Sequence, residues 1–147
     1  MAAIRRADVT WTGDLASGSG EVWASSSEAF SALPVSWSSR TEQSAGQTSP
    51  EELVAAAHAS CYAMAFAGAL ARNGTPPERL EVSASVTFDK VDEGWKVVSS
   101  ALTVEGVVPG MSEDDFRVAA ESARDRCPIS GALKGNVELS VRASLAG

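Results

Sequence analysis

The sequence has few of the residues from which metal sites and hydrolytic triads are built. Its 147 residues include one histidine, His58, and two cysteines. A structural zinc site takes four ligands from these residue types, so we expect no bound metal. Ser60 lies two positions from His58, a spacing that does not bring helical side chains face to face, so a Ser-His-Asp triad is not indicated. Neither a phosphate-binding loop nor a dinucleotide fingerprint occurs, and we expect no cofactor.

Basic charge and long apolar runs are also scarce. Twelve lysines and arginines stand against nineteen acidic residues, a net charge of −7 with no basic stripe, so no nucleic-acid partner is expected. No apolar run approaches the roughly 18–20 residues of a membrane span, so we expect no membrane partner. Arg5 and Arg6 precede no apolar stretch that would form an export signal. These features predict a cytoplasmic protein whose two cysteines are reduced.

Alternating segments and turn residues predict an α+β fold. The length fits a single domain, residues 1–147. Hairpins dominate, so the sheets should be mainly antiparallel, in the order βββ-α-ββ-α-β. We expect helices at 53–72 and 113–126, with a short helical turn to 133. The expected strands are at 7–11, 21–25, 34–40, 80–89, 95–108 and 136–145. A turn at 92–94 joins the fourth and fifth of them.

The start of the long helix is marked clearly in the sequence. Ser49 is a good N-cap, Pro50 suits the first helical position, and Glu52 would complete a capping box. Residues 53–72 are rich in alanine and apolar almost all round, a pattern typical of a buried helix. Asn73-Gly74 should end it.

The two cysteines are the strongest candidates for chemistry. Cys61 lies in the middle of the long helix, and Cys127 lies at a break before Pro128. If Pro128 begins a new helical turn, the Cys127 sulfur lies near its N-cap, where thiol pKa values are lowered, with Arg124 and Arg126 nearby. The alternative is that both cysteines are small buried hydrophobic residues.

Three other residues have both a structural and a functional interpretation. Glu51 favours the positive end of the helix dipole, and it stands ten residues before Cys61, about 15 Å along the axis. It cannot reach that sulfur from its own helix. Arg40 closes the third expected strand and could simply be exposed. His58 shares a helix face with Cys61, and it is either a satisfied core histidine or a pocket residue.

Several motifs resemble those of one known family. Thr48-Ser49-Pro50-Glu51-Glu52-Leu53, followed by Ala56-Ala57-His58-Ala59-Ser60-Cys61, resembles the central helix of the OsmC/Ohr family of osmotically inducible and organic hydroperoxide resistance proteins. The similarity covers nearly the whole chain. Four further segments match the OsmC branch, namely Trp11-Thr12-Gly13-Asp14, Asp89-Lys90-Val91-Asp92, Val108-Pro109-Gly110 and Cys127-Pro128-Ile129-Ser130.

This resemblance implies a fold and an activity. The fold would be sheets wrapped around two central helices in an intertwined homodimer, with active sites at the subunit interface. The activity would be thiol-dependent reduction of organic hydroperoxides and hydrogen peroxide, an antioxidant function in the oxidative stress response. Cys61 would attack the peroxide, and Cys127 would resolve the product through a redox-active disulfide. Arg40 would hold the thiolate and peroxide, and Glu51 would pair with Arg40.

The resemblance also implies a partner and leaves alternatives open. An external dithiol, lipoyl-type or thioredoxin-like, would reduce the disulfide. The turn 12–20 has no arginine, which favours the OsmC branch and leaves the role of the active-site cation to Arg40. A thiol redox sensor or small-ligand binding module would share the fold and the disulfide, and an inactive relative is the third alternative.

Overall fold

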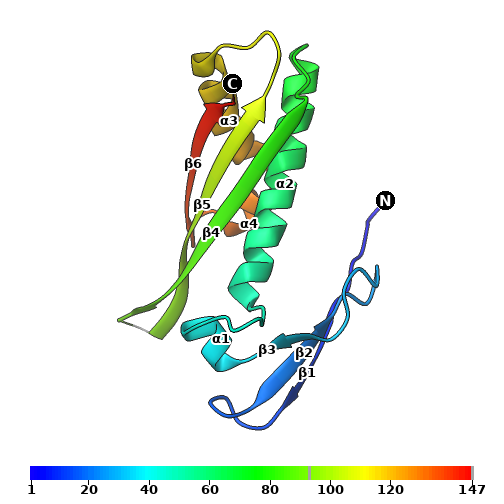
Figure 1. Ribbon diagram of the computed structural model, residues 1–147, viewed down its shortest axis with the longest axis vertical. Coiled ribbons are helices and arrows are strands. Elements are labelled where there is room, and N and C mark those ends of the chain that lie inside the picture. Colours follow the sequence, from blue (N-terminus) through cyan, green and yellow to red (C-terminus); the bar gives the residue numbers. More distant parts are fainter. Residues whose placement is uncertain (93, 147) are drawn as a thin grey trace. The chain divides into compact units, whose positions relative to one another are not determined.

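The computed structural model describes residues 1–92 and 94–146 and has the predicted α+β class (Figure 1). It contains the expected order of strands and long helices and the expected short helix that ends at 133, with one further short helix at 37–41. It divides into two compact units, Met1–Leu53 and Val54–Gly147, so the single domain stays a prediction. The elements are β1 (Asp8–Thr12), β2 (Ser19–Trp23), β3 (Leu33–Val35), α1 (Trp37–Thr41), α2 (Pro50–Arg72), β4 (Arg79–Val91), β5 (Gly94–Val107), α3 (Glu113–Arg126), α4 (Pro128–Leu133) and β6 (Glu138–Leu145).

The N-terminal unit contains an antiparallel sheet in the order β1-β2-β3. The predicted strand 34–40 is wrong in its second half, because β3 ends at Val35 and helix α1 follows. Ser36 caps α1: its hydroxyl accepts a hydrogen bond from Ser39 N at 3.1 Å, and Ser39 Oγ accepts one from Ser36 N at 3.1 Å. Serine side chains compete for backbone groups in this way and favour caps over strands. Arg40 therefore lies on a helix.

Helix α2 has the predicted N-cap and the predicted end, but the expected capping box is only half formed, because the Glu52 carboxylate bonds to the Thr48 hydroxyl and not to Ser49 N among the described hydrogen bonds. Ser49 Oγ accepts a hydrogen bond from Glu52 N at 3.1 Å, while the Glu52 carboxylate accepts one from the Thr48 hydroxyl at 2.7 Å. At the C-terminal end, Gly74 has φ +85°, its N–H bonds to Ala71 O, and Thr75 N–H bonds to Leu70 O. These two bonds form a Schellman motif, which satisfies the last carbonyls of the helix.

The expectation that α2 is buried all round is wrong for the single chain. The stripe of buried side chains has a spacing of four, with His58, Tyr62, Phe66 and Leu70 all at 0–1% exposure, whereas Met64 is 72% exposed. The expectation that no apolar run could span a membrane is also corrected. Helix α2 has 23 residues, and an 18-residue stretch of it has a mean hydropathy of 1.5, so it is long and apolar enough for a span. Core helices of soluble proteins have the same properties, so this is weak evidence for a membrane.

The sheet of the C-terminal unit has the order β4-β5-β6. Strands β4 and β5 form the predicted antiparallel hairpin, whose predicted turn at 92–94 includes Glu93, outside the described residues. Strand β6 pairs parallel to β5, because α3 and α4 carry the chain back to the start of the sheet. The described sheets are thus mainly antiparallel, with this parallel pair added.

Aromatic residues join α2, α3 and the sheet into one core within the C-terminal unit. The rings of Phe66 on α2 and Phe116 on α3 have centroids 5.2 Å apart. Gly106 on β5 lies directly beneath Phe116, where an added Cβ would stand 2.6 Å from the ring. Helix α2 is therefore fixed by packing over the length that carries Cys61.

The predicted break between the two C-terminal helices is confirmed. Ser112 caps α3 by accepting a hydrogen bond from Asp115 N at 3.1 Å. Cys127 is both the C-cap of α3 and the N-cap of α4, and Pro128 takes the first position of α4. The chain direction changes at Cys127, which places its sulfur beside the start of a helix.

Candidate active site

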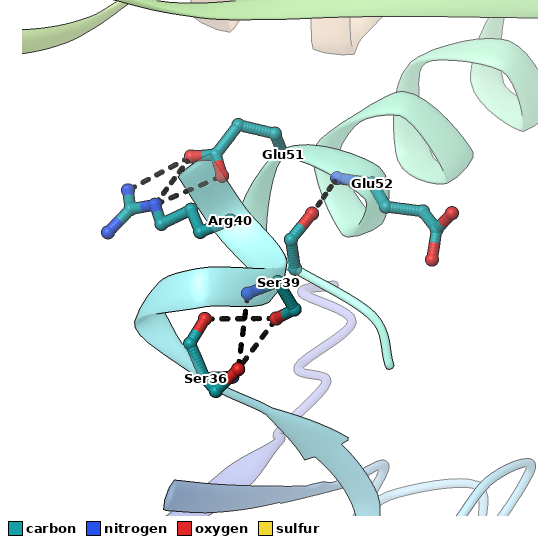
Figure 2. Close-up of polar contacts among 6 residues, drawn as sticks. Ser36, Ser39, Arg40, Glu51 and Glu52 are labelled. Atoms are coloured by element: carbon teal, nitrogen blue, oxygen red, sulfur yellow. Dashed lines mark hydrogen bonds and ion pairs between the residues drawn. The ribbon is translucent and has the colours of Figure 1, made fainter. Parts of the chain in front are cut away.

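Arg40 and Glu51 form an ion pair within the N-terminal unit (Figure 2). Arg40 Nε donates to Glu51 Oε1 at 3.0 Å and Oε2 at 3.1 Å, and Nη2 donates to Oε2 at 2.9 Å. The Glu51 side chain is 9% exposed and that of Arg40 is 30% exposed. A fork of this kind is a strong, directional contact that fixes the guanidinium plane. The pairing that the resemblance implied is present in the structure.

Serine and threonine hydrogen bonds hold α1 in place for this pair. Ser39 Oγ donates to Thr48 O at 3.0 Å, and Ser36 Oγ donates to Gln47 Oε1 at 2.7 Å (Figure 2 shows both serines). These bonds tie α1 to the segment that leads into α2. The position of Arg40 is thus set by local polar contacts, and its guanidinium also lies 5.8 Å from the centre of the Trp37 ring, a cation–π contact.

A cavity of about 430 Å³ lies beside Arg40 in the same unit. Its walls are almost wholly apolar, and Arg40 is the one charged residue among the described residues that line it. Apolar residues of these walls include Val9, Trp11, Leu15, Val22 and Trp37. An apolar space with a single cation suits a small molecule that has a hydrocarbon part and a polarisable oxygen group.

Both cysteines are free thiols of the C-terminal unit. Cys61 on α2 is half-buried, whereas Cys127 is 1% exposed. Burial raises the pKa of Cys61, the Ile129 backbone opposes this, and a hydrogen bond with Cys127 raises the pKa further. The two thiols therefore lie within side-chain contact of each other.

The pKa of Cys127 is shifted in the opposite direction. Burial alone would raise it, but hydrogen bonds from the backbone and hydroxyl of Ser130, from Cys61 and from the Ile129 backbone together lower it. The sulfur makes no cap bond of normal geometry, yet the start of α4 still stabilises its thiolate. This downward direction agrees with the lowered pKa that the sequence predicts for Cys127.

His58 is fully buried and satisfied at both ring nitrogens. Its Nδ1 lies 2.6 Å from Ser100 Oγ on β5, and its Nε2 lies 2.8 Å from Ser130 Oγ on α4. Burial lowers the pKa of His58, so the ring is neutral. The structure thus makes it a core histidine. The sequence did not single out either serine, although Ser130 stands three residues after Cys127.

Comparisons with known proteins identify the family to which the chain is similar. The family described as OsmC-like protein matches residues 42–142. Peroxiredoxin OsmC of Escherichia coli (strain K12) is 34% identical over 139 residues, covering 95% of this chain and 96% of its own. Organic hydroperoxide resistance protein of Xanthomonas axonopodis pv. citri is 27% identical over 95 residues, or 64% of this chain and 65% of its own.

Solved structures of similar proteins share the fold. The organic hydroperoxide resistance protein OhrB of Bacillus subtilis superposes with a TM-score of 0.74 at 21% identity, over 95% of this chain and 98% of that one. The organic hydroperoxide resistance protein OsmC from Legionella pneumophila superposes with a TM-score of 0.71 at 20% identity, over 97% of this chain and 99% of that one. These relatives favour α2 as a core helix of a soluble protein. The chain belongs to the OsmC-like family, and it is a peroxidase-type enzyme with a hydroperoxide-related redox function.

Proposed function

We propose that this protein reduces organic hydroperoxides and hydrogen peroxide by a two-cysteine cycle, with Cys61 as the attacking residue and Cys127 as the resolving residue. The observation that carries the proposal is the contact between two free thiols from separate elements, α2 and the start of α4. Such a pair can pass from dithiol to disulfide with little movement. No cofactor or metal takes part in the proposed cycle.

Exposure and pKa support this division of roles. Cys61 is half-buried, so a peroxide can reach its sulfur, whereas Cys127 is closed off from solvent at 1% exposure. A resolving thiol needs only to reach the partner sulfur, and the lowered pKa of Cys127 keeps it nucleophilic. In the proposal, the more accessible thiol of Cys61 attacks first, and the buried thiolate of Cys127 follows.

The raised pKa of Cys61 means that its thiolate needs a cation. Arg40 supplies this charge in the proposal, and Glu51 fixes the orientation of the guanidinium through the fork described above. The apolar cavity beside Arg40 supports alkyl hydroperoxides as substrates. Arg40 would stabilise the thiolate and polarise the O–O bond.

The chemistry balances in three steps. The Cys61 thiolate attacks one peroxide oxygen, the O–O bond breaks, and an alcohol or water leaves after taking up a proton. The Cys127 thiolate then attacks the Cys61 sulfur of the sulfenic acid, forming the disulfide and releasing hydroxide, which is protonated to water. An external dithiol, lipoyl-type or thioredoxin-like, reduces the disulfide and supplies the two electrons.

We also propose that the working form is an intertwined cytoplasmic homodimer. Helix α2 is apolar all round, yet a single chain buries only one stripe of it and leaves Met64 72% exposed. A second copy would cover the remaining face, and the pairs Arg40–Glu51 and Cys61–Cys127 could then converge from one subunit or from two. Neither nucleic acid nor membrane is a partner in this proposal. Sedimentation of the purified protein as a monomer at micromolar concentration would contradict the dimer.

Steady-state peroxide consumption tests the function. Wild type and Cys61→Ser are compared with tert-butyl hydroperoxide or hydrogen peroxide, and with dithiothreitol or dihydrolipoamide as reductant. We expect many turnovers in wild type and none in Cys61→Ser. The control is Ser60→Ala, since the Ser60 hydroxyl is exposed and donates only to carbonyls of its own helix. One stoichiometric oxidation, without turnover, would favour the alternative of a redox sensor or binding module.

A further inference from the structure

The hydrogen bonds around His58 determine where its proton lies. Ser100 is fully buried, and in the described part of the chain its hydroxyl has His58 Nδ1, at 2.6 Å, as its one partner. A buried hydroxyl proton without an acceptor would be costly, so Ser100 donates to Nδ1. The neutral imidazole carries a single proton, and that proton must then be on Nε2.

The same proton count continues to Ser130. Nε2–H lies 2.8 Å from Ser130 Oγ and donates to it, so the oxygen is an acceptor in this contact. The Ser130 hydroxyl keeps its own proton for a different acceptor. Ser130 is 2% exposed and is the third residue of α4, whose N-cap is Cys127, so its hydroxyl lies on the same first turn as the Cys127 sulfur, and it is one of the groups that lower the pKa of that thiol. The order of donors therefore runs from Ser100 through His58 and Ser130 to Cys127.

We propose that His58 is a positioning residue for the resolving step, because its Nε2–H holds the Ser130 hydroxyl in the orientation that donates to the Cys127 thiolate. The proposal rests on the two-cysteine cycle above for its functional meaning. With the opposite tautomer, Nε2 would accept the Ser130 proton, and the thiolate would lose that donor. His58 acts through Ser130 and touches neither the peroxide nor the sulfur.

The consequence concerns the second chemical step alone. The Cys127 thiolate attacks the Cys61 sulfur, the S–O bond of the sulfenic acid breaks, and hydroxide leaves and is protonated to water. The Ser130 hydroxyl stabilises the thiolate before this attack and transfers no proton. The rate of disulfide formation should therefore depend on His58, Ser100 and Ser130, whereas the rate of peroxide attack on Cys61 should not.

Spectroscopy provides the first test, because the chain has a single histidine. The nitrogen chemical shifts of His58 in the reduced, isotope-labelled protein report which ring nitrogen carries the proton. We expect the Nε2–H form. The Nδ1–H form, or a charged ring at neutral pH, would overturn the proposal. This measurement needs neither a variant nor a peroxide.

Ionisation of Cys127 provides the second test. In the Cys61→Ser background, ultraviolet absorbance of the thiolate follows Cys127 alone. Ser130→Ala should move this titration to higher pH, and Ser130→Thr, which keeps the hydroxyl, should restore it. Two titratable groups interact with Cys127, namely Cys61 and Tyr62 on α2, and Tyr62 in turn interacts with Glu121 and Arg124 on α3. All variants leave Tyr62, Glu121 and Arg124 unchanged. An unchanged titration in Ser130→Ala would overturn the proposal.

Rates of the two steps provide the third test. After one equivalent of peroxide, Ser130→Ala should slow disulfide formation about tenfold, the effect of one charge-assisted hydrogen bond, and lengthen the life of the sulfenic acid. Peroxide attack should keep its rate. His58→Leu should behave in the same way. Because His58→Leu leaves two hydroxyls unpaired and could fail to fold, His58→Gln is the second variant, since its amide can donate to Ser130 and accept from Ser100.

The outcomes separate this proposal from the proposed function. Equal slowing of both steps in His58→Gln and Ser130→Ala would show a merely structural role and overturn the proposal. If wild type shows no peroxide turnover, while the Nε2–H tautomer and the Ser130 dependence of the Cys127 titration are found, the donor order is supported and the peroxidase cycle fails.

Discussion

The two units of the chain hold their functional groups by different means. In the N-terminal unit, Arg40 on the short helix α1 and Glu51 on the first turn of α2 are placed by serine caps and a charged fork, with little core around them. In the C-terminal unit, Cys61 and Cys127 are placed by an aromatic core joining α2, α3 and the sheet. The guanidinium is thus positioned by polar contacts and the thiols by packing. Removing the Arg40 cation should therefore act mainly on the rate of peroxide reduction, whereas truncating the aromatic core should act mainly on stability.

The largest expected effect is on the core of the C-terminal unit. Phe66→Ala removes a fully buried ring that contacts both Tyr62 and Phe116. We expect the free energy of unfolding to fall by about 3–5 kcal/mol, the usual cost of such a cavity. Urea denaturation measures it. Val118→Ala, at a 71% exposed site on α3, is the control and should change stability by less than about 0.5 kcal/mol.

An equal loss of unfolding free energy in Phe66→Ala and Val118→Ala would mean that the aromatic core contributes no more to stability than an exposed site on α3. The comparison between the two units would then lose its basis.

The next effect is on the ion pair of the N-terminal unit. Arg40→Met removes the cation but keeps much of the side-chain volume, and we expect peroxide consumption to fall by about a hundredfold or more. Arg40→Lys should recover only part of the activity, because lysine lacks the planar fork that contacts Glu51. The measurement is kcat/KM for tert-butyl hydroperoxide.

Arg117→Met is the matched control for this change. Arg117 pairs with Glu113 on α3 at 3.5 Å, with a 60% exposed side chain, so its removal should leave the rate intact. Full activity in Arg40→Met would remove Arg40 from the site and contradict the division of roles between the units.

Sequence reasoning predicted the parts of this molecule that depend on local chemistry. The cap at Ser49 and the stop at Gly74 each depend on a few neighbouring residues, and the structure contains both. The strand expected at 34–40 is wrong beyond Val35, because the serine pair Ser36 and Ser39 begins α1 there. Two competing local patterns cannot be ranked without the tertiary contacts that favour one of them.

Other features depend on contacts between residues far apart in sequence. The partners of His58 lie 42 and 72 positions away, so no local pattern could reveal them. The parallel direction of β6 depends on the path of α3 and α4, and it was not predicted. Arg40, Glu51, Cys61 and Cys127 were named through resemblance, and their catalytic roles stay predictions until turnover is measured.

A smaller effect concerns the pH dependence of stability, and it isolates the C-terminal unit. Burial lowers the pKa of His58, so the unfolded chain binds a proton at a higher pH than the folded one does. Stability should therefore fall as pH drops below about 6.5, with a slope from this residue of at most about 1.4 kcal/mol per pH unit. His58→Gln cannot titrate and should lack this component, which urea denaturation at several pH values would reveal. If the free energy of unfolding depends on pH equally in wild type and His58→Gln, then His58 takes up its proton at the same pH in the folded and the unfolded chain, which contradicts this prediction.

The smallest effect concerns the cap that positions Arg40. Ser36→Ala removes the hydroxyl that accepts from Ser39 N and donates to Gln47 Oε1, so we expect a loss of about 1 kcal/mol of stability, typical of an N-cap. Its effect on kcat/KM should be larger than that of Ser60→Ala, because α1 carries Arg40 whereas the Ser60 hydroxyl bonds only within α2. Ser36→Asp, another good N-cap, should restore both stability and rate. If Ser36→Ala lowers stability without changing kcat/KM, the cap stabilises α1 but does not determine the position of the Arg40 guanidinium. The hydrogen bonds to Glu51 alone would then hold Arg40 in place.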